Sequence, residues 1–290
     1  MLKKYPTRSE LGQAGYGQGC ASWLANYPGV VSRIRPIAVG ALGMLVLWCL
    51  LLGLGLQVRE SALYSVALLA QVLTGGYLWL LLITQRGKRS SIDVLEFLGM
   101  GIAIGTALAL LSGELLLHLI PSSLGWLIPS IVVAVLWLSR RGKVSAKSLP
   151  TLTYPGRTLI AFGISTVVGI ISIALNLSRY PLAGVTQWSE YHVDMLYFEG
   201  LTHSLASFGP GDSIFMSGSD IRYHWFSYAW VGQLNDFAGA QSFAGLTRLL
   251  PLVALIGVAS LATSWTARLT EVRWAPILSG LLVVSGGFVG

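Results

Sequence analysis

The chain has 290 residues, and 54% of them are hydrophobic while only 11% are charged, against about 25% charged residues in ordinary soluble domains. Long apolar runs with so few charges indicate an integral membrane protein. The net charge of +7 comes from basic residues in short loops between the apolar runs. This is the pattern of cytoplasmic loops in membrane proteins, and it argues against nucleic-acid binding.

The first 178 residues divide into a polar arm and five apolar runs. Residues 1–35 are basic and contain no early apolar core of the signal-peptide type, so we interpret them as a cytoplasmic arm. A run of about 20 apolar residues is long enough to cross the hydrocarbon core as a helix. Arg59 and Glu60 are predicted to form a short turn after the first span. The five spans predicted within residues 36–178 are 36–58, 62–84, 92–111, 124–138 and 158–177.

Polar residues are rare inside these spans. Gln71 lies mid-span, where a hydrogen bond between helices is a better explanation than a transport site. Glu114 and His118 are one turn apart near the outer end of the third span and are expected to be interfacial.

Residues 179–246 form a long polar segment, and residues 247–290 contain two further spans, at 247–266 and 274–290. The last span is still apolar at Gly290, so we expect the chain to be the front part of a longer protein. Basic clusters follow the even-numbered spans and occupy the N-terminus, which places the segment 179–246 outside the cytoplasm. We therefore predict an all-α, multi-pass cell membrane protein with a cytoplasmic N-terminus. It has about seven spans and an interfacial amphipathic helix in an extracytoplasmic loop.

Ionisable residues concentrate at 187–236, between the fifth and sixth predicted spans. Three of the chain's four histidines and six of its twelve acidic residues lie there, against the single base Arg222. This concentration favours a functional site. The alternative is that polar residues collect wherever a membrane protein leaves the membrane. The residues are His192, His203, His224, Glu190, Asp194, Glu199, Asp212, Asp220 and Asp236.

An amphipathic helix is predicted at 194–208. Apolar residues recur there at helical spacing, at positions 193, 196, 197, 201, 205 and 208. Glu199, Thr202 and His203 fall on the other side. The segment is too polar to span the membrane, so we expect it to lie in the outer interface. Asp194 is in its first turn, where a carboxylate is either a helix cap or a catalytic group.

A second candidate cluster follows two glycine turns. Asp220, Arg222 and His224 occupy alternate positions. Such a cluster could bind a phosphate, because arginine grips oxyanions with parallel N–H bonds and protonated histidine adds a donor. The alternative for an aspartate in a glycine turn is a bond to nearby backbone amides. An aromatic belt of the kind found at headgroup level follows, and with the cluster it predicts a pocket for an amphiphile. The belt contains Tyr223, Trp225, Phe226, Tyr228 and Trp230.

A metal site is an alternative use of the same residues. His192, Asp194, His203 and His224 match no tight zinc spacing. Oxygen-rich sites for Mg²⁺ or Mn²⁺ leave little sequence signature. A divalent metal cofactor therefore stays an open alternative.

The segments YHVDMLYFEGLTHSLASFG and GSDIRYHWFSYAWVGQL, with the many-span architecture, resemble the integral-membrane glycosyltransferases of the GT-C superfamily. The resemblance implies transfer of a sugar from a polyprenyl-phosphate-linked donor to an extracytoplasmic glycan or lipid acceptor. It also implies that Asp194 is the base, while Arg222 and His224 face the phosphate. The other catalytic candidates are Glu199 and His192, and the other substrate-binding candidates are Asp220, His203 and Trp225.

This chain departs from the family pattern in one respect. The family usually places its loop carboxylate after the first span, whereas five predicted spans precede Asp194.

A transporter is the first alternative function, and it would carry ionisable residues deep in its spans and broken helices in corresponding halves. The first, second, fourth and fifth predicted spans have almost no such residues. A non-catalytic membrane scaffold is the second alternative.

Overall fold

The computed structural model describes residues 28–85, 89–120, 122–140, 149–179, 193–213, 216–220 and 225–288. The chain consists of two compact units, Met1–Val46 and Leu47–Gly290. In the first unit, the described residues form the start of helix α2 (Pro28–Gly53). Proline suits the first helical position because its φ is already helical and its missing N–H needs no partner there. The helix therefore begins before Pro36, the start of the first predicted span.

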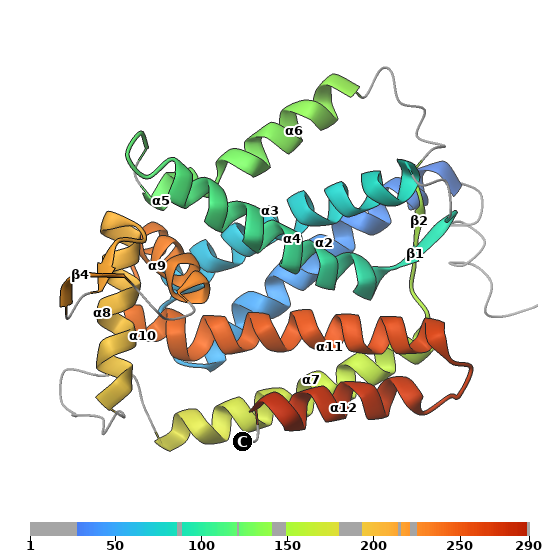
Figure 1. Ribbon diagram of the computed structural model, residues 1–290. Helices are drawn as coiled ribbons and strands as arrows, with labels where there is room; N and C mark the ends of the chain where they lie inside the picture. Colours follow the sequence, from blue (N-terminus) through green and yellow to red (C-terminus); the bar gives the residue numbers. More distant parts are fainter. Residues whose placement is uncertain are drawn as a thin grey trace, which may run out of the picture. The chain divides into compact units, whose positions relative to one another are not determined.

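The second unit is predominantly helical, which confirms the predicted all-α fold class (Figure 1). Two small sheets accompany the helices: β1 (Ser91–Asp93) pairs in parallel with β2 (Thr151–Thr153), and β3 (Asp212–Ser213) pairs antiparallel with β4 (Met216–Asp220). The helices are α3 (Val58–Gln85), α4 (Val94–Leu115), α5 (Ser122–Gly125), α6 (Ile128–Arg140), α7 (Gly156–Arg179), α8 (Val193–Phe208), α9 (Phe226–Ala238), α10 (Ser242–Ala244), the π-helix η2 (Gly245–Leu249), α11 (Leu250–Leu269) and α12 (Ala275–Phe288).

The long helices of this unit run between two ends (Figure 1). One end carries α8, α9 and α10, and we name it the α8–α9 end. The other carries the paired strands β1 and β2, and we name it the β1–β2 end. Helix α8 lies across the direction of α11 (Figure 1), as expected of a helix that does not itself cross a membrane.

Four helical segments among the described residues are long and apolar enough to cross a membrane. They are Val58–Gln85, Val94–Leu115, Gly156–Ser178 and Gly245–Leu269. The prediction of about seven spans is not supported, because three further apolar stretches, Gly40–Gly53 within α2, Ile128–Ser139 within α6 and Ala275–Gly286 within α12, are shorter. At 1.5 Å per residue, the 13 residues of α6 extend only about 20 Å, against a hydrocarbon core of about 30 Å.

The turn between α2 and α3 differs from the prediction. Arg59 and Glu60 belong to the first turn of α3, and the chain reverses just before them, where Gly55 has a φ of 92°. A left-handed residue of this kind favours glycine. The backbone N–H of Gln57 donates to the Glu60 carboxylate at 3.1 Å, which is one half of a capping box. Glu60 therefore starts a helix and does not occupy a loop.

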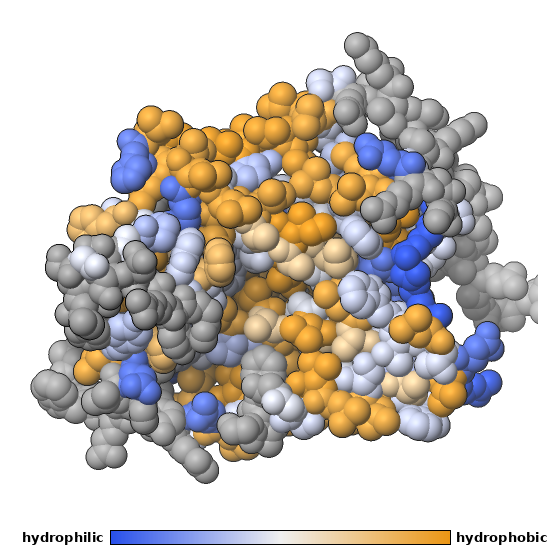
Figure 2. Space-filling model, viewed as in Figure 1, coloured by the Kyte–Doolittle hydropathy of each residue, from blue (hydrophilic) through white to orange (hydrophobic). Residues whose placement is uncertain are grey.

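Apolar side chains remain exposed along the membrane-length helices. On α7, Ile160 is 62% exposed, Val167 57%, Ile171 53% and Leu175 65%, and these positions recur at helical spacing along one side. A continuous exposed apolar stripe is a surface for lipid or for another protein, because water disfavours it. Figure 2 shows hydrophobic residues over the central region and hydrophilic residues gathered at the β1–β2 end. Length, composition and surface together identify a membrane protein.

Helices α3 and α4 pack with their backbones in contact. A Cβ atom at Gly105 would lie 2.0 Å from the carbonyl oxygen of Gln71, and one at Gly75 would lie 2.4 Å from that of Gly101. Small residues allow such close approach in membrane helices, where van der Waals packing takes the place of the hydrophobic effect. Helix α9 packs against the pair of helices that this contact holds together.

Candidate functional site

The predicted helix at 194–208 is confirmed as α8, Val193–Phe208. Its Leu201 and Leu205 are fully buried and α8 packs against α9, so the helix is anchored to the bundle end by its apolar side chains. The contact with α9 is close, because a Cβ at Gly232 would lie 2.4 Å from the Thr202 carbonyl oxygen.

The polar face predicted for α8 is partly wrong. Thr202 was expected beside Glu199 and His203 on the exposed side, but it is fully buried and its hydroxyl donates to the Phe198 carbonyl at 2.6 Å. Leu196, by contrast, is 62% exposed although it belongs to the predicted apolar stripe. Because α8 packs against α9, the buried face of α8 is centred nearer Thr202 than the apolar pattern predicts.

Three sequence-predicted candidates lie on α8. Asp194 and His203 are exposed, and Glu199 is half-buried. Burial raises the pKa of Glu199, and the nearby His203 opposes this shift. A carboxylate with a raised pKa is a better proton acceptor near neutral pH than an ordinary one. Glu199 is therefore the described carboxyl group of α8 whose environment suits general-base chemistry.

The loop candidates are only partly within the described residues. Asp220 ends strand β4, where its backbone pairs with Asp212 on β3. His192, Arg222 and His224 lie outside the described residues, so their predicted roles stay predictions. Within the described part of the chain, no group of three or more His, Cys, Asp or Glu residues is placed to hold a metal ion.

The aromatic belt is divided by the fold. Trp225 is half-buried and stacks on the exposed Phe226, with ring centroids 4.5 Å apart. Tyr228 and Trp230, predicted to lie at headgroup level, are instead buried at 9% and 5% exposure. They are on the inward face of α9, and Tyr228 stacks on Phe198 of α8 at 4.9 Å.

Helix α9 is bound to α3 by polar contacts. The indole N–H of Trp230 donates to the Gln71 side-chain oxygen at 3.0 Å, and this confirms that Gln71 makes a contact between helices. The hydroxyl of Tyr64 donates to the Asn235 side-chain oxygen at 2.5 Å. Buried polar groups need such partners, so these pairs fix the position of α9.

A third polar contact joins α9 to α4. The Gln233 amide donates to one carboxylate oxygen of Glu114 at 2.8 Å. The second oxygen of Glu114 and the amide oxygen of Gln233 are buried and accept no hydrogen bond from the described residues. Glu114 was expected to be interfacial beside His118. It is turned toward α9, while His118 is exposed.

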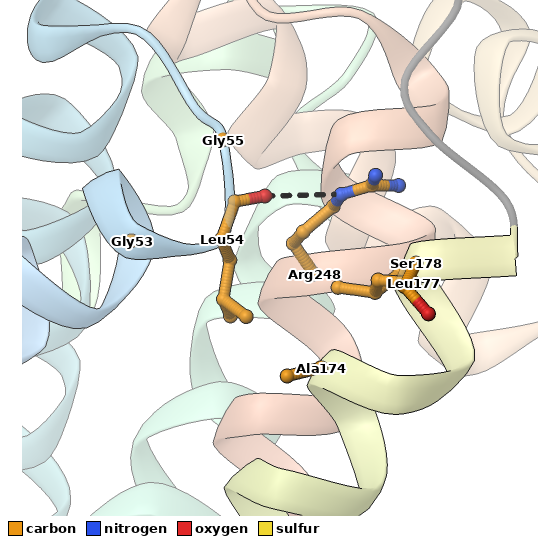
Figure 3. A pocket seen from close by; sticks show the side chains of 7 residues that line it. All are labelled: Gly53, Leu54, Gly55, Ala174, Leu177, Ser178 and Arg248. Carbon is orange, nitrogen blue, oxygen red and sulfur yellow. Dashed lines mark hydrogen bonds between the residues drawn. The ribbon is translucent and has the colours of Figure 1, made fainter.

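A pocket of about 430 Å³ lies beside Arg248, also near the α8–α9 end. Gly53, Leu54 and Gly55 of the turn between α2 and α3 form one wall, and Ala174, Leu177 and Ser178 near the end of α7 form another. Figure 3 shows the Arg248 side chain between the two walls. The pocket thus combines one cationic group with the apolar side chains of Leu54, Ala174 and Leu177 and the hydroxyl of Ser178.

Arg248 as a whole residue is only 3% exposed. Its Nε donates to the Leu54 carbonyl at 3.4 Å, and its Nη1 donates to the Thr247 hydroxyl. The residue belongs to η2, a five-residue π-helix of the kind that often marks functional sites. Gly245 starts this π-helix and packs on Asn235, so Arg248 is held by the same framework as α9.

Sequence inspection missed Arg248 because it is the second residue of the predicted sixth span. An arginine at the end of a predicted span is usually interpreted as one whose side chain extends to the lipid headgroups. The signal that could have identified Arg248 as a functional candidate is its position inside an apolar run, since charges within the membrane are often functional.

Comparison with protein-family models, with curated proteins and with solved structures found no match for this chain.

Proposed function

We propose that this chain is a polytopic membrane glycosyltransferase-like protein. It transfers a sugar from a polyprenyl-phosphate-linked donor to a glycan or lipid acceptor, and the reaction takes place at the α8–α9 end. The observation that carries the proposal is the buried Arg248 beside a pocket lined in part by apolar side chains. An amphiphilic phosphate fits this combination, because its charged head needs a cation and its tail needs an apolar surface.

The chemistry requires two kinds of group. A sugar leaving a lipid phosphate leaves negative charge on the phosphate, and a guanidinium in a partly dehydrated site stabilises that charge. Arg248 has the burial for this task, and Arg222 and His224 are the further phosphate-facing candidates. The acceptor hydroxyl needs a proton acceptor within hydrogen-bond reach. Asp194 takes this role by resemblance, and Glu199 is the second candidate because burial raises its pKa.

The remaining candidates complete the site. His192 serves as a further proton-transfer group, and Asp220, His203 and Trp225 contact the sugar or the acceptor. A divalent ion such as Mg²⁺ or Mn²⁺ would assist the leaving phosphate if the residues outside the described ranges bind it.

The distribution of charge supports the orientation of this site. Near the β1–β2 end, Arg157 begins α7 and Arg268 lies in the last turn of α11, while Arg89 and Arg273 lie in the loops beside the long helices. Under the positive-inside rule this end faces the cytoplasm, and the α8–α9 end faces the extracytoplasmic side. Helix α2, with 26 residues, is long enough for a further crossing, whereas α6 and α12, with 13 and 14 residues, are too short to cross on their own.

Polar contacts within the spans weigh against a transporter. Thr74 donates to Ser130 at 2.9 Å between α3 and α6, and Trp230 donates to Gln71 at 3.0 Å between α9 and α3. These groups are used in fixed contacts between helices, whereas a substrate path needs polar groups that are free to exchange partners.

The decisive experiment measures turnover of a lipid-linked sugar and binding of the donor with the full-length protein. Arg248→Gln keeps an N–H donor at about the position of Nε but removes the charge and the Nη donors, so it should weaken donor binding by about tenfold or more. Arg248→Lys should rescue only partly, because an ammonium lacks the planar fork.

Arg59→Gln is the matched control, since Arg59 is an exposed arginine at the start of α3. Equal donor binding by the Arg248→Gln and Arg59→Gln proteins would remove Arg248 from the proposed site. A full-length protein that turns over no polyprenyl-linked sugar would refute the proposed function as a whole.

A further inference from the structure

The β1–β2 end contains a second pocket, of about 320 Å³, built from ionisable residues. Its walls come from the loops and ends of several helices that are distant in sequence. Its charged lining residues are Arg89, Asp93, Glu96, Arg157 and Arg268, and its hydroxyl-bearing lining residues are Ser91, Thr153, Thr158 and Ser264.

Glu96 organises two of the three arginines. Its carboxylate is 1% exposed, and its two oxygens each accept one bond of 2.8 Å, one from Arg89 and one from Arg268. The indole N–H of Trp79 donates to the same carboxylate at 3.2 Å. Arg89 and Arg268 are still 33% and 43% exposed, and each guanidinium has five donors. One bond to Glu96 therefore leaves other donors for a second acceptor.

Arg157 adds a third guanidinium. Its Nη2 donates to the carbonyl oxygens of Thr270 and Val272. Its Nε is buried and has no hydrogen-bond partner among the described residues. A buried donor without an acceptor carries a desolvation cost, which a bound ligand with oxygen atoms would relieve.

The charge balance favours an anion. Three guanidinium groups face two carboxylates, Asp93 and Glu96, which leaves an excess of one positive charge in the lining. Burial also raises the pKa of Asp93, so the positive excess grows as the pH falls. Helix α7 (Gly156–Arg179) begins at this pocket, and helix N-termini favour negative charge; the N-terminus of α4 (Val94–Leu115) is already capped by the Asp93 carboxylate, which accepts from the Leu95 N–H at 2.9 Å.

We propose that this pocket binds a phosphate group carrying net negative charge. A lipid headgroup fits its position best. The pocket lies where the segments Val94–Leu115 and Gly156–Ser178 begin and where Gly245–Leu269 ends, and headgroups occupy this level on either side of a membrane. The exposed apolar stripe of α7 starts at Ile160, two positions after the pocket-lining Thr158, and it offers an acyl chain a surface.

The test uses the purified full-length protein in a neutral detergent and measures binding of phosphatidylglycerol and of phosphatidylcholine with matched acyl chains. Phosphatidylglycerol should bind and raise the unfolding temperature, while zwitterionic phosphatidylcholine should not. A third arm contains inorganic phosphate alone. Stabilisation by inorganic phosphate equal to that by phosphatidylglycerol would identify the soluble ion as the ligand, and stabilisation by the lipid alone would identify the headgroup.

Arg157→Gln should weaken phosphatidylglycerol binding by about tenfold or more, because a charge-assisted hydrogen bond is lost. Arg273→Gln is the matched control, since Arg273 is an exposed arginine near the same end but does not line the pocket. Equal binding by these two variants would overturn the proposal, and so would equal binding of phosphatidylcholine and phosphatidylglycerol by the unmodified protein.

A second pair of variants guards against a folding defect in Arg157→Gln. Ser91→Asp adds a negative charge to the pocket wall and should abolish binding. Thr151→Asp adds the same charge at the partner position on β2, outside the pocket lining, and should leave binding intact. Retained binding in the Ser91→Asp protein would also overturn the proposal.

Discussion

The contact between α3 and α4 leads to a prediction about stability that needs no knowledge of function. Gly105→Ala should destabilise the protein, because the added Cβ atom would lie 2.0 Å from the Gln71 carbonyl oxygen and 2.5 Å from its carbonyl carbon. Both atoms belong to the α3 backbone, so no side-chain rotation can relieve the clash. The two helices must move apart along the region where they pack most closely.

The magnitude follows from two opposing effects. Overpacking a close contact costs about 1–3 kcal/mol, while replacing a helical glycine by alanine contributes up to about 1 kcal/mol through helix propensity. Gly163→Ala isolates the second effect, because Gly163 is within α7 and a Cβ there would meet no atom within 4 Å. The two variants should therefore change stability in opposite directions.

The assay is thermal unfolding of the purified protein in detergent, followed by the fluorescence of its ten tryptophans. Gly105→Ala should unfold at a lower temperature than the unmodified protein, and Gly163→Ala at the same or a higher temperature. If Gly105→Ala is as stable as Gly163→Ala, then α3 and α4 do not pack through their glycines, and the position inferred for α9 loses its support.

Three further predictions test α8 and the orientation of the bundle. Burial raises the pKa of Glu199 in the folded protein above its pKa in the unfolded chain. The free energy of unfolding should therefore rise as the pH falls from the folded-state pKa to the unfolded-state pKa. Glu199→Gln should remove that rise in a pH series of unfolding curves. Thr202→Asp should destabilise the protein strongly, since it places a carboxylate at a fully buried position, whereas His203→Asp at the adjacent exposed position should be tolerated; equal unfolding temperatures would contradict the packing of α8. The orientation is tested with single cysteines in a background without the native cysteines. A cysteine replacing the exposed Ser207 should react with an impermeant thiol reagent in intact cells, and one replacing Ser90 should react only after the membrane is opened. The reverse pattern would invert the orientation.

Local patterns in the sequence were sufficient where one helix determines its own structure. The spacing of apolar residues predicted α8 to within one residue of Val193–Phe208, because a helical stripe is a property of the segment itself. Gln71 was predicted to bond another helix, since an amide in hydrocarbon needs a partner. The identity of that partner, Trp230, lies 159 positions away and leaves no local signal.

Tertiary packing decided the features that the sequence did not predict. The fourth predicted span is interrupted because Trp126 is buried between α5 and α6, where it is 1% exposed and packs edge-to-face with Phe237, with ring centroids 5.0 Å apart. Thr202 is buried because Gly232 on α9 allows a close approach. An average over apolar residues does not record such contacts, since they depend on shape at a distant position.

Arginine side chains differ in burial and in bonding partners between the two ends of the bundle. This difference separates the proposed anion site from the proposed sugar-transfer site. At the β1–β2 end, Arg89 and Arg268 both bond Glu96 and remain partly exposed, which fits the anion site that we propose there. At the α8–α9 end, Arg248 is almost completely buried and bonds the carbonyl of Leu54. Dehydrating a guanidinium is costly, and this burial is the reason for assigning Arg248 to the phosphate of the proposed site. Because distant sites without shared partners act independently, loss of phosphatidylglycerol binding in the Arg157→Gln protein leaves the role of Arg248 untouched, and each proposal is decided by its own variants.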